Sequence, residues 1–287
     1  GYGPPGTVTS QGRIVLPVHA LIGGRGVDRA KGLFGDEEAR VGAHGWETYI
    51  SYNFSYHSDD EGQTWQPNRG KGVWGGGGEL FVTIDQTLGG HHGCEEPVVA
   101  EVSPNHLLMV HRTGLGRFYQ SWSSDDGASW TPPEPTGIAT AQAPASLKRI
   151  PGTDDLLLVW NQASADEIQR GRQRHRLSTA ISRDGGVTWR HGRNIFFPVG
   201  SDPQEVTRIE PPPDLRCYRA WEQVPRLPLT DLEGMYPSVS FWQDRVIITF
   251  NCVERSLRLL DKQGETPSRG QRTAVCIGLP VSWFYGG

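Results

Sequence analysis

Four arginines stand at alternate positions in one short segment, at Arg170, Arg172, Arg174 and Arg176. If the segment is extended, its period of two brings all four to one face. A guanidinium group stays charged at every relevant pH, and its planar fork pairs bidentately with a carboxylate, so one of these arginines could hold an acidic ligand. The competing interpretation is a solvated loop, which is the usual fate of a run of like charges.

A short pattern that occurs three times, SxDxGx[ST]W, indicates the elements that must position such groups. Its copies are residues 58–65, 123–130 and 182–189. The shared Asp and Gly suit a tight turn closing a hairpin, and the Trp that ends each copy can pack between neighbouring sheets. These Trp residues lie 65 and 59 residues apart. Each interval is long enough for one small antiparallel sheet, so a radial array of sheets is expected.

Short apolar segments rich in Val, Ile, Tyr, Phe and Trp recur along the chain, as in β-strands, and no long stretch keeps a helical period. The predicted strands are 13–21, 48–57, 97–102, 107–112, 118–123, 145–150, 156–160, 177–182, 238–242, 245–250 and 273–283. Two irregular stretches, 23–45 and 201–233, interrupt them and could flank a pocket. We therefore expect an all-β chain.

The repeated pattern is the Asp-box, and the chain resembles the sialidase (neuraminidase) superfamily of β-propellers. The resemblance implies a six-bladed propeller, with residues 1–287 as a single domain and the Asp-boxes on its outer rim. Three Asp-boxes and the C-terminal strands account for about four sheets, so the chain is expected to lack its first blades. Residues 279–285 resemble the family's last strand. The Asp-box also occurs in non-catalytic propellers, so it implies a fold and not an activity.

The resemblance also implies that arginines hold the carboxylate of a terminal sialic acid, since family members use three for this purpose. Arg112 ends the predicted strand 107–112 and stands in the place of the second arginine. Arg174 precedes the predicted strand 177–182 and fits the third arginine best by position, with Arg176 as the second choice.

Two parts of the family's apparatus have no counterpart in this sequence. The first arginine normally belongs to an Arg-Ile-Pro sequence of the first blade, but residues 13–15 lack the proline and residues 149–151 lie between later Asp-boxes. The general acid is an Asp on a first-blade loop, and Asp28 is only a weak substitute. Loss of the first blades and loss of catalysis in a binding protein would both produce this result.

The family's nucleophile is a tyrosine, because a second carboxylate beside the substrate's own would suffer like-charge repulsion. A phenol with an ordinary pKa of about 10 needs a neighbouring glutamate to take its proton. Tyr236 precedes the penultimate strand group, which ends at residues 247–250, and resembles the nucleophile, the alternative being a core or rim tyrosine. Glu96 lies sixteen residues before Arg112, on the strand expected to pair with it, and Glu95 is its rival for the role of base.

Bulk properties exclude some partners and leave others open. The net charge is −4, so no general basic field favours nucleic acid, and an acidic glycan would have to be bound by local cations. No apolar run approaches the roughly 18 residues of a membrane span. His91, His92 and Cys94 are too closely spaced for a tetrahedral metal site, so they are expected at a pocket rim, and no metal or cofactor is expected.

Cysteine usage and the start of the sequence say little about compartment. The four cysteines have no CxxC spacing and are interpreted as ordinary thiols. The sequence begins at Gly1 without a charged and then apolar leader, so secretion or a periplasmic location is left open.

The leading hypothesis is a glycoside hydrolase that removes terminal sialic (nonulosonic) acid as a retaining exo-sialidase. Tyr236 and Glu96 would be its catalytic couple, and Arg112 and Arg174 would bind the substrate carboxylate. The alternatives are a non-catalytic Asp-box propeller that binds acidic glycans or a protein partner, and a glycosidase for another acidic sugar.

Overall fold

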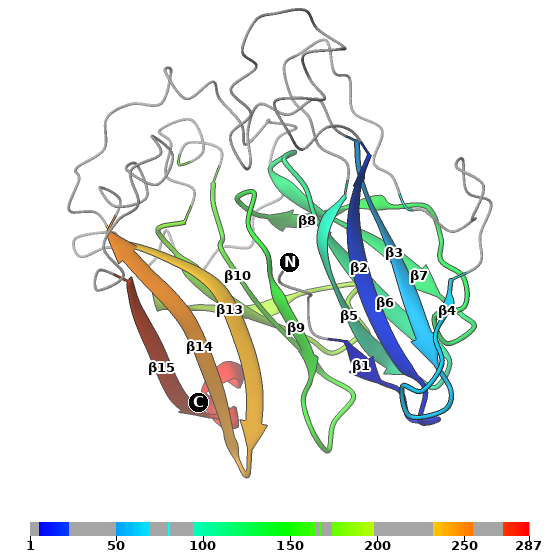
Figure 1. Ribbon diagram of the computed structural model, residues 1–287. Coiled ribbons are helices and arrows are strands. Elements are labelled where there is room, and N and C mark those ends of the chain that lie inside the picture. The colour runs from blue at the N-terminus through cyan, green and yellow to red at the C-terminus, as the bar shows by residue number, and fades with distance from the viewer. Residues whose placement is uncertain are drawn as a thin grey trace, which may run out of the picture.

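The computed structural model describes residues 6–22, 50–68, 80, 94–164, 167, 174–197, 232–254 and 272–286 of the 287-residue chain. Within these ranges the chain forms four antiparallel sheets and one short C-terminal helix (Figure 1). The first sheet contains β1 (Thr7–Val8), β2 (Ile14–Ile22), β3 (Ile50–Ser58) and β4 (Gln66–Pro67). The second contains β5 (Glu95–Ser103), β6 (His106–Arg112), β7 (Arg117–Ser123) and β8 (Glu134–Ala139).

The other two sheets follow in chain order. The third contains β9 (Ser146–Arg149), β10 (Leu156–Trp160), β11 (Leu177–Ser182) and β12 (Arg190–Phe196). The fourth contains β13 (Leu232–Trp242), β14 (Arg245–Glu254) and β15 (Arg272–Pro280), and a 3-10 helix, η4, covers Val281–Tyr285. Each strand pairs with its neighbours in sequence, so every sheet is a simple meander. The all-β prediction is confirmed.

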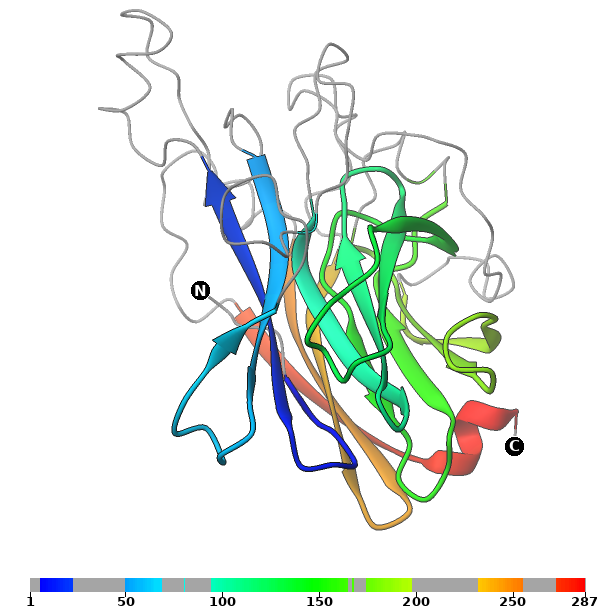
Figure 2. The ribbon, with the colours of Figure 1, turned by 90° about the vertical axis from the view of Figure 1, so that its right-hand side faces the viewer.

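Successive sheets lie side by side, as the two perpendicular views in Figures 1 and 2 show. Strand β2 contacts β5, β5 contacts β9, and β9 contacts β13, so the first strands of the later sheets line the inner side of the array. This is the arrangement of propeller blades, with four sheets among the residues described.

The apolar core lies between the sheets, and strand β10 takes part in two layers of it. Leu156, Leu158 and Trp160 pack in the cluster between the second and third sheets. Leu157 and Val159 pack in the cluster between the third and fourth sheets. All five side chains are fully buried, which explains why this strand is continuously apolar rather than alternating.

The three Asp-box turns join the third and fourth strands of the first three sheets. Asp60, Asp125 and Asp184 each accept a hydrogen bond of 2.8 Å from the backbone N–H four residues later. The following glycines are left-handed, with φ of 87°, 85° and 97° at Gly62, Gly127 and Gly186. The predicted turns are therefore confirmed, with the carboxylate satisfying the backbone as expected.

The end of the last predicted strand is wrong. Strand β15 stops at Pro280, which has no N–H to continue the ladder, and the chain turns into η4. This turn places Phe284, which is 1% exposed, in the core between the third and fourth sheets. The predicted irregular stretch 201–233 also ends too late, because Leu232 and Glu233 already belong to β13.

Several predictions lie outside the described residues, including the stretch 23–45, Asp28, His91 and His92. Cys94, Cys252 and Cys276 form no disulfide in the described part of the chain, and Cys217 falls outside the described ranges. In the part of the chain that the structure describes, no helix has the length and apolar character needed to cross a membrane.

Candidate functional site

Strand pairing places the predicted site residues and the Asp-box turns at opposite ends of the sheets. In the second sheet Glu95 pairs with Arg112 at one end, while Leu107 pairs with Ser123, the first residue of an Asp-box, towards the other. In the third sheet Leu156 pairs with Ser182, which opens the third Asp-box. Arg174 precedes this sheet's strand β11 and therefore lies at the far end from that turn.

Arg112 is held by two carboxylates. Its Nη1 forms an ion pair with Glu96 Oε2, and its Nε lies 3.3 Å from Glu95 Oε2. Arg112 and Glu95 are each 3% exposed, whereas Glu96 is only partly buried. Burial by itself lowers the pKa of the Arg112 guanidinium, but the negative charges of Glu95 and Glu96 outweigh it and raise that pKa, so Arg112 is a permanent cation.

Arg174 lies over the ring of Tyr236. Its guanidinium carbon is 5.4 Å from the ring centroid, which is within the range of a cation–π contact. Its Nη2 donates to the backbone carbonyl of Gln142 at 3.3 Å, and its Nη1 lies 3.7 Å from Met235 Sδ. Contacts therefore join the four predicted residues in two pairs, Glu96 with Arg112 and Arg174 with Tyr236.

Arg176, the second choice for the third arginine, has a different environment. It forms an ion pair with the carboxylate of Glu167. The same carboxylate accepts a 2.8 Å hydrogen bond from the backbone N–H of Ser164, whose hydroxyl accepts the N–H of Glu167 at 3.2 Å. This reciprocal pair is a capping box, and it fixes Glu167 beside Arg176. Arg170 and Arg172 lie outside the described residues.

Glu96 and Tyr236 share an unusual backbone. Glu96 has φ of 32° and Tyr236 has φ of 56°, and each stands in a strand at a register irregularity. Each is followed by a proline, Pro97 or Pro237. A left-handed residue other than glycine costs on the order of 1 kcal/mol or more, and bulges re-aim side chains next to active sites. The two predicted catalytic residues are thus both held in strained, redirected positions.

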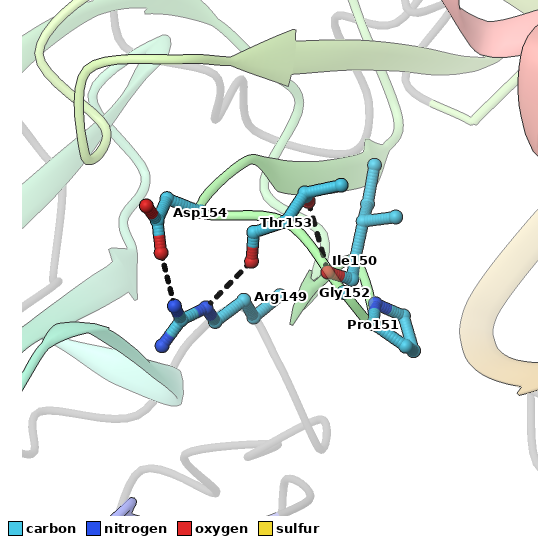
Figure 3. Close-up of a pocket in the computed structure, with 6 residues that line it drawn as sticks. All are labelled: Arg149, Ile150, Pro151, Gly152, Thr153 and Asp154. Carbon is cyan, nitrogen blue, oxygen red and sulfur yellow. Dashed lines mark hydrogen bonds and ion pairs between the residues drawn. The ribbon is translucent and has the colours of Figure 1, made fainter.

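The sequence Arg149-Ile150-Pro151 lies far from this group, in the turn between β9 and β10 at the Asp-box end. It lines a cavity of about 380 Å³ together with Gly152, Thr153 and Asp154 (Figure 3). Arg149 Nε donates to the Thr153 carbonyl at 2.9 Å, and its other nitrogens face Asp154 and Glu101. This arginine therefore pairs with its own turn and with Glu101, at the end of the sheets opposite Arg112 and Arg174.

Sequence reasoning missed two residues at this end of the sheets. Glu95 was considered only as a rival of Glu96, whereas it is a second partner of Arg112. Asn161 follows the buried run of β10 directly and donates hydrogen bonds to both neighbouring segments of the site. A polar residue at the end of a fully apolar strand was the available signal for Asn161.

The meandering sheets, the Asp-box turns and the residues gathered at their far end define a propeller of the Asp-box class. A family model for the BNR repeat-like domain matches residues 5–248, so the chain belongs to this family. Comparison with curated proteins finds no match.

Two solved structures show how the fold compares. A Dyadobacter fermentans protein of unknown function is 17% identical with a TM-score of 0.52, and the match covers 96% of this chain and 53% of that one. The Trypanosoma rangeli sialidase is 13% identical with a TM-score of 0.50, and the match covers 97% of this chain and 31% of that one. The chain therefore spans about half or less of each of these structures.

Proposed function

We propose that this chain carries the sugar-acid site of a sialidase-like exo-glycosidase. The observation that carries the proposal is the two contacts Glu96–Arg112 and Arg174–Tyr236, in which both proposed catalytic residues occupy left-handed bulges. The shared fold with the Trypanosoma rangeli sialidase supports it. We also propose that the four sheets belong to a six-bladed ring, as in the superfamily.

Arg112 and Arg174 would dock the carboxylate of a terminal sialic acid. Tyr236 Oη would then attack the anomeric carbon while Glu96 takes the phenol proton and the bond to the leaving oxygen breaks. The leaving oxygen requires a proton from an acid, and the sequence candidate Asp28 lies outside the described residues. Attack of water on the anomeric carbon would then break its bond to Tyr236 Oη. The water would give a proton to the acid that protonated the leaving oxygen, Glu96 would return its proton to the phenolate, and the sugar would be released with its original anomeric configuration.

The ion pair between Glu96 and Arg112 also agrees with this order of reaction steps. A guanidinium that faces two carboxylates has less attraction left for the carboxylate of a substrate. When Glu96 accepts the phenol proton it becomes neutral, and Arg112 then binds the substrate carboxylate more strongly. Because this gain appears during the reaction, it would stabilise the transition state more than the bound substrate.

Hydrolysis of a fluorogenic sialoside tests the proposal. The wild type is expected to be active, and Tyr236→Phe, which removes only the attacking oxygen, should lose roughly a thousandfold or more of kcat. Tyr56→Phe is the matched control, because this exposed tyrosine belongs to β3 beside an Asp-box turn. An inverted first product by NMR, or full activity of Tyr236→Phe, would contradict the mechanism.

The second candidate is a propeller that binds acidic glycans without cleaving them. The sequence favours it, because it offers no counterpart of the family's first arginine and only a weak substitute, Asp28, for the general acid. This candidate predicts calorimetric binding of a sialylated oligosaccharide that is unchanged by Tyr236→Phe, with no hydrolysis by either protein.

A further inference from the structure

Asn161 connects the two sheets that carry Arg174 and Tyr236. It is fully buried at the end of β10, in the third sheet. Its Nδ2 donates to the carbonyl of Arg176 at 2.8 Å and to the carbonyl of Gly234 at 2.8 Å. Both amide hydrogens are therefore used, one on the segment that leads into β11 and one on β13 of the fourth sheet.

The surrounding backbone completes the connection. The N–H of Gly234 donates to the carbonyl of Arg174 at 2.9 Å, so the same glycine is bonded on both sides. A Cβ on Gly234 would come within 2.9 Å of the Phe196 ring, so only glycine allows this close approach. Gly234 precedes Tyr236 by two residues, and the strand irregularity begins at Met235. The contacts of Asn161 thus anchor a regularly paired residue two positions before Tyr236, where the strand irregularity lies.

Asn53 makes a similar but longer connection on the other side of the site. It is fully buried in β3 of the first sheet, and its Nδ2 lies 2.8 Å from His111 Nδ1 in the second sheet. The same nitrogen lies 3.5 Å from the carbonyl of Glu95, the residue before the Glu96 bulge. In both places a buried asparagine from one sheet faces a backbone carbonyl just ahead of a left-handed site residue in the next.

We propose that Asn161 is a positioning residue, which sets the separation between Arg174 and Tyr236 by fixing both backbones to one amide group. Asn53 holds the backbone ahead of Glu96 in the same way, through the carbonyl of Glu95. The effect on catalysis rests on the function proposed above, whereas the effect on backbone order does not. A hydroxyl of similar size has one hydrogen and a carboxylate has none, so neither can replace the two donated bonds.

Kinetics of Asn161→Ala and Asn161→Asp test the catalytic part. With a fluorogenic sialoside, kcat should fall about 10- to 100-fold while KM changes less than about threefold, because the nucleophile is displaced rather than the carboxylate lost. Asn161→Asp keeps the shape of the side chain, so it serves if the alanine variant does not fold. Ser178→Ala is the control, since its buried hydroxyl lies 3.0 and 2.7 Å from Gln162 and Asn194 within the same sheet.

Hydrogen exchange separates the failure of this proposal from the failure of the proposed function. Faster amide exchange in residues 232–236 of the Asn161 variants, but not of Ser178→Ala, supports the positioning role whether or not the wild type hydrolyses sialosides. An inactive wild type would overturn the proposed function alone. Unchanged exchange in that segment, or an active wild type whose Asn161 variants keep kcat within about twofold, would overturn the positioning role.

Discussion

At the scale of single residues, the candidate site carries an unfavourable contribution to the free energy of folding. Removing a guanidinium and two carboxylates from water is unfavourable, and their mutual attraction repays the cost only with good geometry. Arg112 and Glu95 are almost completely buried, and Glu96 and Tyr236 add strained backbone to that cost. Such an arrangement contributes little net stability, so a functional role is the more reasonable explanation for it.

Replacing Arg112 alone should therefore lower the free energy of unfolding more than replacing Arg112 together with Glu95. Arg112→Met leaves the buried Glu95 and the partly buried Glu96 without their cation, and the free energy of unfolding should fall by about 3 kcal/mol or more. Adding Glu95→Gln to the same protein should restore part of this loss, because one of the two carboxylates is then neutral. Urea denaturation measures both changes, and a single variant as stable as the wild type would contradict the ion-pair interpretation.

His111 should make the protein sensitive to mild acid. Burial lowers the pKa of this histidine to about 3, and its ring nitrogens face Asn53 and Ser121. The unfolded chain binds a proton on His111 below pH 6.5 while the folded protein does not, so stability falls as the pH decreases from about 6.5 towards 3. The steepest slope is about 1.4 kcal/mol per pH unit.

The variant His111→Gln isolates this effect from the other titrating groups. It should be less stable than the wild type at pH 7, because the replacement fits the buried hydrogen bonds less well. The difference in unfolding free energy between the two proteins should shrink by about 2 kcal/mol between pH 7 and pH 5. A difference that stays constant with pH would show that His111 is protonated in the folded protein.

At the scale of elements, sequence reasoning succeeded where a strand is apolar and failed where it is not. Each predicted strand overlaps an observed one, because burial of one or both faces imposes an apolar pattern. The missed strands are β1, β4, β8 and β12, and each is an edge strand of its sheet. Both residues of β4 are exposed, and β12 carries Arg190 and Arg193. An edge strand has no second neighbour to cover it, so its sequence resembles a loop.

The candidate site was likewise predictable from the sequence only in part. The family resemblance was enough to identify Arg112, Arg174, Glu96 and Tyr236 as candidates. Their binding and catalytic roles stay predictions. The resemblance could not separate the surroundings of Arg174 from those of Arg176, because these depend on Glu167, which is brought close by the fold. The connection through Asn161 joins two sheets and leaves no periodic signal in the sequence.

Replacing a glycine of an Asp-box turn should lower the stability of the protein where the new side chain would point into the next sheet. Gly186 has φ of 97°, and a Cβ there would lie 2.3 Å from Leu108 Cδ2, which belongs to the core of the second sheet. Gly186→Ala should therefore lower the free energy of unfolding by about 2–4 kcal/mol, combining backbone strain with a clash. Urea denaturation measures the loss.

Gly152→Ala, in the turn between β9 and β10, is the matched control for Gly186→Ala. Gly152 is also left-handed, with φ of 76°, but a Cβ there would meet nothing within 4 Å. Its loss should be only about 1 kcal/mol, from the backbone conformation alone. Equal losses in the two variants would mean that packing between the second and third sheets tolerates the added methyl group.

At the scale of the whole molecule, the Asp-box turns and the candidate site occupy opposite ends of one stack of sheets. Neighbouring sheets must keep their relative positions, since Glu96 and Arg112 belong to the second sheet, Arg174 to the third and Tyr236 to the fourth. Helix η4 contributes to this, because it continues from β15 of the fourth sheet and contacts β11 and β12 of the third. The C-terminal segment thus helps to hold the two sheets between which Arg174 meets Tyr236.

Tyr285 is the residue through which this connection can be tested. Its hydroxyl donates to Asp155 Oδ2 at 2.6 Å, and the Arg183 guanidinium carbon lies 5.1 Å from its ring centroid. Tyr285→Phe keeps the ring and removes the bond, so the free energy of unfolding at pH 7 should fall by about 1–1.5 kcal/mol. Asp155→Asn, which retains an acceptor oxygen, should cost less than the tyrosine variant.

The same contact predicts a loss of stability in alkali. Partial burial and the Asp155 carboxylate raise the pKa of Tyr285 to about 12, above its ordinary value of 10. The folded protein therefore retains a proton that the unfolded chain releases, and this contribution is complete below pH 10 and lost as the pH rises towards 12. The difference in Tm between the wild type and Tyr285→Phe should shrink from pH 7 to pH 11. If the difference is unchanged, the phenol does not donate to Asp155, and the aromatic contacts of η4 must hold the third and fourth sheets together by themselves.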